Sequence, residues 1–583
     1  MRALRTLAAA AAITVSAPAV AQDAAGDWIG TLGSGPGALT VVVHLARDAE
    51  GALTGTLDSP NQNARGIAMA AIVAADGELR FTVPAVGGRY QATWDAAAGH
   101  WRGTWAQGAG PAPLNLRAAT AEDLAAAAQP APPPPPLPAD WRVPADDEIV
   151  RLIQQRNAPR AGQGMVVGVL EPGRAKTIGE GPAGAAAFGA DSLFEIGSIT
   201  KVFTALLLAD MANKGEVSLD DPAAKFLPDG HRMPERGGRQ ITLKDLSQHT
   251  SGLPRLPDNL PLSDPDDPYA DYTEEQLLAF LDGYQLPRDI GAQSEYSNLG
   301  VGLLGYLLAR AAGKDYETLL AERITGPLGM DDTMVSLPPA RQAELVQGHD
   351  QYMRPAGPWT LPTLVGAGGL RSTADDMLKF ARAVLDPASP IAGAVATALG
   401  NRFDTGNASF EQALGWQVIH PEPGREVLLH NGGTGGYRSA LAIEPATQSA
   451  VVVLVNSTVE PSATDFAMHL LVGAPLAPLQ PLPEPPPPRV ARTEVELPVA
   501  ELDRVVGSYD FGDGVLHITR EGTVMRSARE GVPTLQIFPE APLQFFFKAI
   551  DAQLRFTADD SGKVTGVTFI QPGFEASGTR TDP

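Results

Sequence analysis

The stretch FEIGSITKVFTALLLADM, residues 194–211, contains the arrangement on which the fold and the chemistry depend. Ser198 and Lys201 stand three positions apart at the start of an apolar run with helical spacing, so their side chains fall on one face of the expected helix. A serine hydroxyl becomes a nucleophile when an adjacent base takes its proton, and a desolvated lysine can be that base. The pair is therefore a candidate nucleophile with its activating group.

A structural role for the same two residues is the alternative. Ser198 would then cap the helix, and Lys201 would be a solvated surface residue. A lysine in the first turn lies near the positive end of the helix dipole, which disfavours cations by up to about 1 kcal/mol. The position of Lys201 therefore argues for a function, although a Ser-x-x-Lys motif is short and recurs by chance.

The composition limits the classes of function. With 583 residues, the chain is long enough for roughly three or four domains. Its formal charge of -23 argues against nucleic acid or an anionic membrane surface as a partner. The chain has no cysteine, and its nine histidines show no metal-ligand spacing, so we expect no disulfide, no metal and no cofactor.

The N-terminus has the pattern of an export signal. Arg2 and Arg5 precede an apolar segment, which ends in Ala19-Val20-Ala21, a small-x-small cleavage pattern. We therefore predict that residues 1–21 are a signal peptide. No later segment has 18 uninterrupted apolar residues, so the mature protein is expected to be periplasmic or secreted, without a membrane segment.

Two all-β modules are predicted to flank a central domain. Residues 24–117 and 497–580 consist of short alternating runs separated by turn residues, typical of an antiparallel barrel or sandwich, lipocalin-like in the second case. Proline-rich or alanine-rich linkers at 118–140 and 476–496 separate these modules from residues 141–475, and the first is expected to be an extended spacer. Four tryptophans of the first module are expected in its core: Trp28, Trp94, Trp101 and Trp105.

The central domain, residues 141–475, mixes helical and strand patterns and is predicted to be α/β or α+β, with one sheet and many helices. Two of its helices are expected to end at Gly252 and Gly313. A capping box of Ser372 and Asp375 is predicted to start another helix.

Two further motifs in this domain have simple structural explanations when each is taken alone. In Tyr296-Ser297-Asn298, the asparagine is expected to be the N-cap of the next helix, and the tyrosine a buried aromatic. In His430-Asn431-Gly432-Gly433, an Asn-Gly pair between apolar runs is typical of a hairpin turn.

The three motifs together, in this order and at this spacing, resemble the serine β-lactamase and penicillin-binding protein superfamily, in particular its class C branch. This branch includes D-aminopeptidases, D-Ala-D-Ala carboxypeptidases and esterases. The resemblance covers roughly residues 141–475 and extends to LSQHTSGLP, YSNLGVGLLG, GAGGLRSTADDMLKFA and HNGGTGGYRSALAIEP. It implies a β-lactamase-like domain with an antiparallel sheet flanked by helices.

The resemblance also implies roles at the matching positions. Ser198 would attack a carbonyl and form an acyl-enzyme, while Lys201 and Tyr296 would shuttle protons. A phenol has an ordinary pKa near ~10, so this role of Tyr296 requires a nearby cation, which Lys201 would supply. Sequence alone leaves open whether the lysine or the tyrosine is the base.

Substrate binding is implied for Asn298, which would contact the substrate amide and help fix Lys201, and for His430, Asn431 and Gly432. The main-chain N–H groups of Ser198 and Gly433 would form an oxyanion hole. The chain departs from the β-lactamases where they have Lys-Thr-Gly, because His430 takes the place of the lysine. A histidine is mostly neutral at pH 7, so tight binding of the carboxylate of a penicillin or of a D-Ala-D-Ala terminus is not expected at this position.

The sequence thus predicts a secreted serine hydrolase that acts on an amide or ester, such as a D-amino-acid peptide, a peptidoglycan-derived peptide or a small ester. A true class C β-lactamase and a catalytically weak peptidoglycan- or peptide-binding protein are the alternatives. The presence of Ser198, Lys201 and Tyr296 argues against the binding protein, and the absence of Gly-x-Ser-x-Gly argues against an α/β-hydrolase. The sequence does not define an oligomeric state.

Overall fold

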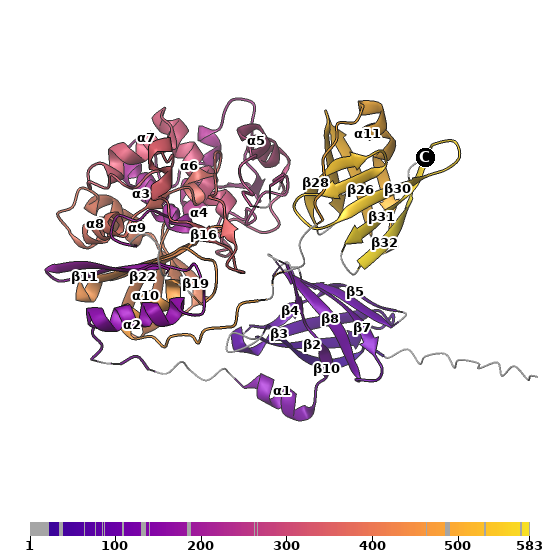
Figure 1. The fold of residues 1–583 in the computed structure, drawn as a ribbon, viewed down its shortest axis with the longest axis horizontal. Helices are drawn as coiled ribbons and strands as arrows, with labels where there is room; N and C mark the ends of the chain where they lie inside the picture. Colours follow the sequence, from indigo (N-terminus) through magenta and orange to yellow (C-terminus); the bar gives the residue numbers. More distant parts are fainter. Residues whose placement is uncertain are drawn as a thin grey trace, which may run out of the picture. The chain divides into compact units, whose positions relative to one another are not determined.

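The structure is a computed structural model. It describes residues 23–581 except for the following: 34–38, 63, 76, 84–85, 87, 108–109, 130–135, 139, 183–187, 262, 265, 462, 484, 486–489, 513, 530–531 and 572–573. The predicted signal peptide, residues 1–21, lies outside the described residues. The chain divides into two compact units, residues 1–135 and residues 136–583, whose elements are labelled in Figure 1.

The first unit is a barrel-like antiparallel sheet of ten strands in the order β4-β3-β2-β1-β10-β8-β7-β6-β5, with β9 paired to β8. The edge strands β4 and β5 follow each other in the chain, which brings the two edges of the sheet together. The strands are β1 (Gly26–Leu32), β2 (Leu39–Arg47), β3 (Leu53–Ser59), β4 (Ala64–Ala68), β5 (Ala70–Ala75), β6 (Glu78–Val83), β7 (Gly88–Asp95), β8 (His100–Gln107), β9 (Gly110–Pro113) and β10 (Leu116–Ala118).

The predicted core role of the tryptophans in this unit is confirmed. Trp28, Trp101 and Trp105 are buried, and the partly buried Trp94 packs edge-on against Trp28 and Trp101 with ring centroids 5.9 and 5.1 Å apart. Edge-to-face contacts of this kind are favourable for aromatic rings.

Part of the predicted linker, residues 118–140, is helical. Helix α1 (Ala121–Ala128) begins at a capping box of Thr120 and Asp123 and contains a run of alanines, the strongest helix former. Residues 130–135 of the proline run lie outside the described residues.

The central domain contains an eight-stranded antiparallel sheet in the order β12-β11-β24-β23-β22-β21-β20-β19. Its strands are β11 (Met165–Glu171), β12 (Arg174–Glu180), β19 (Phe403–Asn407), β20 (Phe410–Gln412), β21 (Gln417–Glu422), β22 (Arg425–Gly433), β23 (Arg438–Glu444) and β24 (Ser449–Val455). Strand pairs of two residues each lie outside this sheet: β13 (Phe194–Glu195) with β18 (Arg371–Ser372), β14 (Glu235–Arg236) with β15 (Arg239–Gln240), and β16 (Gly348–His349) with β17 (Pro355–Ala356).

Helices cover both faces of this sheet (Figure 1). Two of them, α2 (Asp146–Asn157) and α10 (Ala463–Val472), pack on one face. The other face carries α3 (Thr200–Asn213), α4 (Leu243–Ser247), α5 (Glu274–Gly283), α6 (Asn298–Ala312), α7 (Tyr316–Leu320), α8 (Ala374–Leu385) and α9 (Ala392–Gly400). The predicted antiparallel sheet flanked by helices is therefore confirmed.

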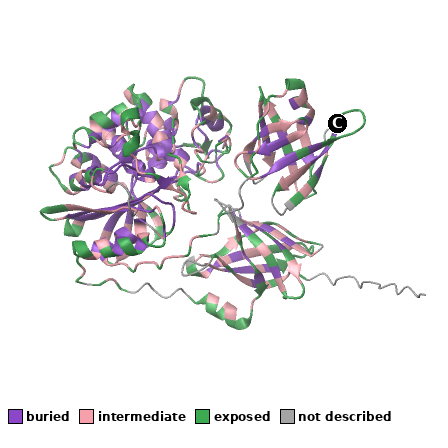
Figure 2. Ribbon diagram, in the orientation of Figure 1, coloured by how far each residue is buried: buried purple, intermediate pink, exposed green. Residues whose placement is uncertain are grey.

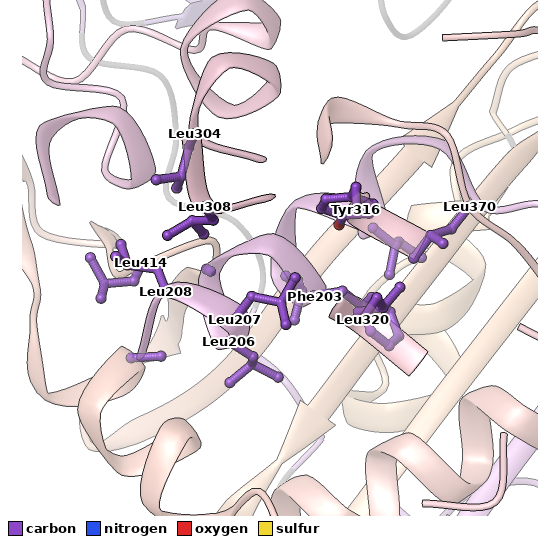
Figure 3. Packing of buried hydrophobic residues seen from close by; sticks show 14 of the residues in the cluster. Phe203, Leu206, Leu207, Leu208, Leu304, Leu308, Tyr316, Leu320, Leu370 and Leu414 are labelled. Carbon is purple, nitrogen blue, oxygen red and sulfur yellow. The ribbon is translucent and has the colours of Figure 1, made fainter. Parts of the chain in front are cut away.

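Helix α3 lies at the centre of the larger helical layer. Eleven of its residues are buried, including Phe203 and Leu206 to Leu208, and leucines of α6 pack against it (Figures 2 and 3). A helix that is apolar on all sides is expected in the middle of a core. The core therefore holds the start of α3, and with it Lys201, in a fixed position.

Three predicted helix boundaries in this domain were wrong. Helix α6 is capped by Ser297, whose hydroxyl accepts the Gly300 N–H, and Asn298 is its first residue. Helix α8 is capped by Thr373 instead of Ser372, which belongs to β18. Helix α4 ends at Ser247, well before Gly252, while the predicted end of α6 at Gly313 is confirmed.

The C-terminal module is a closed barrel of eight antiparallel strands, preceded by the short helix α11 (Val499–Val505). Its strands are β25 (Gly507–Asp510), β26 (Val515–Glu521), β27 (Val524–Arg529), β28 (Val532–Ala541), β29 (Gln544–Phe547), β30 (Gln553–Ala558), β31 (Val564–Gln571) and β32 (Phe574–Arg580). Across the described part of the chain, no helix is both long and apolar enough to cross a membrane.

Candidate active site

Ser198 and Lys201 meet as their spacing predicts. Ser198 lies in a 3-10 turn, Gly197–Ile199, directly before α3, and the Lys201 ammonium nitrogen lies 2.9 Å from its Oγ. Lys201 Nζ also donates to the carbonyl oxygen of Ala367 at 2.6 Å. The lysine side chain is fully buried, so the alternative of a solvated surface lysine is wrong.

Burial has an electrostatic consequence for Lys201. Desolvation lowers its pKa well below the usual value, and the nearby Arg255 charge lowers it further. A neutral lysine has two N–H groups and one lone pair. It can donate one hydrogen bond to Ala367 and still accept the proton of Ser198.

Tyr296 lies beside this pair, with Lys201 Nζ 4.8 Å from the centre of its ring. Burial raises the pKa of Tyr296 to about 12, although its contact with Ser198 and the charge of Arg255 act in the opposite direction. The expectation that a charged Lys201 would lower the pKa of Tyr296 is therefore not met in the free protein, because burial outweighs the charges around the phenol. Both candidate bases contact Ser198.

His249 is part of the site, and the sequence analysis did not single it out. Its main-chain oxygen accepts the Glu295 N–H at 2.8 Å, and its Nδ1 accepts the Ser297 N–H at 3.1 Å. Its ring lies on that of Tyr296, with centroids 4.6 Å apart. His249 thus holds the chain on both sides of Tyr296 and covers the ring between them.

Two features of His249 suit this place. Its φ of +61° turns the chain sharply after α4, a conformation that few residues other than glycine adopt. Burial holds its pKa well below the usual value, so the ring is neutral, and the Ser297 contact places the proton on Nε2. The one sequence signal was the stretch LSQHTSGLP.

Asn298 points into the site at the first turn of α6. Its amide group donates to the Tyr269 hydroxyl at 3.2 Å, whereas the expected contact with Lys201 is not formed. Its buried Oδ1 has no hydrogen-bond partner among the described residues. A buried unpaired acceptor is costly, so a donor that reached this oxygen would be bound favourably.

The His430 side chain is on the face of β22 that is packed against the Ser198 turn. It is 2% exposed, and its ring lies 6.5 Å from that of Tyr296. Its Nδ1–H donates to the Asn431 carbonyl at 2.7 Å. Burial lowers the pKa of His430 to about 3. The position that resembles the lysine of Lys-Thr-Gly is therefore occupied by a neutral group.

The Asn431-Gly432 pair does not form a hairpin turn. Both residues belong to β22 and pair with Ala440 and Ser439 of β23. The Asn431 side chain projects from the opposite face, where it donates to Thr464 of α10 at 3.1 Å. The prediction that Asn431 contacts substrate is therefore wrong for its side chain.

The two glycines after Asn431 allow β22 to approach the Ser198 turn. A Cβ on Gly432 would lie 2.0 Å from the Ile196 oxygen, so no side chain fits there. Gly197, with a φ of +50°, would place a Cβ 2.6 Å from the Gly433 nitrogen. This contact brings the main chain of Gly433 next to Ser198, where the predicted oxyanion hole requires it.

A cavity of about 1200 Å³ adjoins the site on the side of Tyr269. Trp359 lines it and packs against the Tyr269 ring at 5.5 Å, and Arg371 lines it and pairs with Glu195 at 3.1 Å. Ser198 is not among the lining residues, so the cavity neighbours the catalytic groups without containing them. Among the residues that the structure describes, no group of acidic or histidine side chains is arranged to hold a metal ion.

Comparison with known proteins agrees with this geometry. The family model described as Beta-lactamase matches residues 149–473, more than half of the chain. The D-alanyl-D-alanine-carboxypeptidase/endopeptidase AmpH of Escherichia coli (strain K12) is 33% identical over 281 residues, which cover 46% of this chain and 71% of the relative. A beta-lactamase of the same strain is 27% identical over 362 residues, which cover 55% of this chain and 91% of the relative.

Among solved structures, a beta-lactamase/D-alanine carboxypeptidase from Yersinia pestis has 26% sequence identity. The match covers 56% of this chain and 97% of that chain, with a TM-score of 0.48. Because the family model spans more than half of the residues, the chain belongs to the beta-lactamase family of serine hydrolases, as its motifs predicted.

Proposed function

We propose that this protein is a periplasmic or secreted hydrolase that forms an acyl-enzyme on Ser198 and hydrolyses a D-amino-acid peptide or a small ester. The observation that carries the proposal is the 2.9 Å contact between Ser198 Oγ and a fully buried Lys201. Export is supported by the signal-like residues 1–21.

Acylation follows from the protonation states. Neutral Lys201 takes the proton of Ser198 as the hydroxyl oxygen attacks the substrate carbonyl carbon. The resulting ammonium is next to Tyr296 and favours transfer of the phenol proton to the leaving amine or alcohol, after which Lys201 returns a proton to Tyr296. The bond to the leaving group breaks, and an ester on Ser198 remains.

Deacylation reverses these transfers with water in place of the leaving group. Water attacks the ester carbon, and its proton passes to the Tyr296–Lys201 pair. Collapse of the tetrahedral intermediate releases the acid and restores the Ser198 hydroxyl. Main-chain N–H groups of Ser198 and Gly433 would stabilise the oxyanion in both steps, and loss of one such donor costs about 100-fold or more in rate.

The absence of a charge on His430 bears on which substrates the site can bind. A β-lactam antibiotic carries a carboxylate, and a neutral His430 provides no permanent cation for it at this position. We therefore infer that amide or ester hydrolysis is faster than lactam hydrolysis. Asn298 Oδ1 would accept a hydrogen bond from a substrate N–H, which favours acylated amino acids and peptides.

Turnover by the mature protein tests this function. We expect hydrolysis of a D-alanyl p-nitroanilide or a p-nitrophenyl ester and little hydrolysis of nitrocefin. Ser198→Ala should abolish it, whereas Ser409→Ala, which changes an exposed serine of the same domain, should have no effect. Rapid nitrocefin turnover would establish a β-lactamase instead, and no turnover of any substrate would favour a binding protein.

A further inference from the structure

Arg255 is an exposed cation at the active site that the proposed mechanism does not use. Its Cζ lies 5.1 Å from the centre of the Tyr296 ring. Within the described part of the chain, its guanidinium forms no ion pair and no hydrogen bond. By contrast, Arg288 pairs with Glu295, and Arg371 pairs with Glu195. Arg255 is thus an unpaired charge in a region where neighbouring arginines are paired.

The main chain fixes Arg255 against the catalytic residues. Its carbonyl oxygen accepts the N–H groups of Asn298 and Leu299 at 3.0 and 3.2 Å. The Ser297 hydroxyl donates to the preceding carbonyl, that of Pro254, at 2.6 Å. Both contacts tie the residue to the first turn of α6, so its side chain starts from a defined point beside Tyr296 and Asn298.

Neither of the other two basic groups nearby can serve as a permanent charge for the substrate. Lys201 is fully buried and bonded to Ser198 and Ala367, and His430 is buried and neutral. The Arg255 charge reaches the interior of the site, where it lowers the pKa of Lys201 and His249. Of these three basic groups, Arg255 is the one that is exposed to solvent.

We propose that Arg255 binds a carboxylate of the substrate at the mouth of the site. The proposal rests on the proposed hydrolase function and defines its substrate class as acids. A guanidinium suits this role because its parallel N–H groups form two hydrogen bonds to one carboxylate and it stays charged at every working pH. The carboxylate can lie on the acyl part or on the leaving group, and Arg255 lies on the Tyr296 ring, at a different place from His430.

Two matched pairs of substrates test the proposal at pH 8. One pair is a p-nitrophenyl succinate monoester and its methyl ester, in which the carboxylate lies on the acyl part. The other is an N-acyl-D-alanyl-D-alanine and its C-terminal amide, in which it lies on the leaving group. Wild type, Arg255→Gln and Arg255→Lys are compared, with Arg382→Gln as the control, since Arg382 on α8 is exposed and unpaired among the described residues as well.

We expect Arg255→Gln to lower kcat/KM roughly 10-fold for the acid of at least one pair, mainly through KM, and to leave its neutral partner within about 2-fold. Arg255→Lys should retain part of the preference, and Arg382→Gln should retain all of it. Equal changes for acid and neutral partner, or no change, would overturn the proposal. Absence of Ser198-dependent turnover of the neutral substrates would instead overturn the proposed function.

Discussion

Two basic side chains face the ring of Tyr296 and differ in almost every other respect. Lys201 is fully buried on the core helix α3 and is bonded to Ser198 and Ala367, whereas Arg255 is exposed and unpaired among the described residues. Burial lowers the pKa of the first well below its usual value, whereas the second is in contact with solvent. In the proposed function, the proton acceptor and the anion-binding group thus contact the same tyrosine ring from distant parts of the chain.

The largest effect is expected from replacement of the buried Lys201. Lys201→Met keeps most of the side-chain volume but removes the proton acceptor, so kcat/KM should fall at least about 1000-fold. Steady-state rates on an ester substrate check this value, and a thermal melt shows whether the variant is folded. A folded Lys201→Met protein with nearly normal activity would assign the base to another group.

Replacement of His249 tests whether catalysis depends on the position of the Tyr296 ring. His249→Ala removes the acceptor for the Ser297 N–H and the contact with the ring, and we expect kcat to fall about 10- to 100-fold. His249→Asn should recover part of this loss, because its carbonyl can accept the same N–H and asparagine tolerates a positive φ.

The measurement for His249 is the pH profile of kcat/KM for both variants and wild type. A displaced Tyr296 alters the proton relay, so the shape of the profile should change in His249→Ala and return in His249→Asn. Equal losses in the two variants, with an unchanged profile, would show that His249 only supports the fold.

Glu195, three residues before Ser198, is a second buried ionisable group, and it makes the stability of the protein depend on pH. Burial raises the pKa of Glu195 to about 7, although the Arg371 charge acts against it. Because the folded-state pKa lies above the unfolded value, the stabilising contribution of the protonated group is complete below about pH 4.5 and is lost as the pH rises through 7. Glu195→Gln lacks this titration.

Between pH 4.5 and pH 8, the Tm of wild type should therefore fall by several degrees relative to the Tm of Glu195→Gln. A constant difference across this range would contradict the raised pKa. Arg382→Gln, on the exposed side of α8, serves as the control with a flat difference.

The smallest effect is expected at the exposed cation. The Arg255 charge lowers the pKa of Lys201, so Arg255→Gln should raise it and move the acid limb of the kcat/KM profile to higher pH by roughly 0.5 unit. High salt should shift the wild-type limb in the same direction, because it screens an exposed charge. Neutral ester substrate is used, so that binding of a carboxylate does not contribute. An unchanged acid limb would show that the Arg255 charge has no effect on the pKa of Lys201.

The local pattern of the sequence was enough to predict the strongest elements of the site. The Ser198–Lys201 pair depends on helical spacing and an apolar run, and both the helix and the contact are present. The end of α6 at Gly313 follows from the left-handed conformation that glycine adopts, and it too is confirmed.

The remaining features depend on contacts between distant parts of the chain. Asn431-Gly432 looks like a turn, but pairing with β23 holds it in a strand, and the close approach of Ile196 explains why a glycine is needed. His249 and Arg255 contact the Tyr296 ring with their side chains, although both stand more than 40 positions away in the sequence. The helix caps at Ser297 and Thr373 differ by one residue from the predictions because neighbouring residues can all cap a helix.

The most direct test of the central claim is the intact mass of the mature protein after brief reaction with a fluorophosphonate at pH 7. The account predicts one adduct on wild type, located at Ser198 by peptide mapping, and none on Ser198→Ala. Lys201→Met should form it far more slowly. An adduct on Ser198→Ala, or equal rates for wild type and Lys201→Met, would contradict the assignment of Ser198 as a nucleophile activated by a buried lysine.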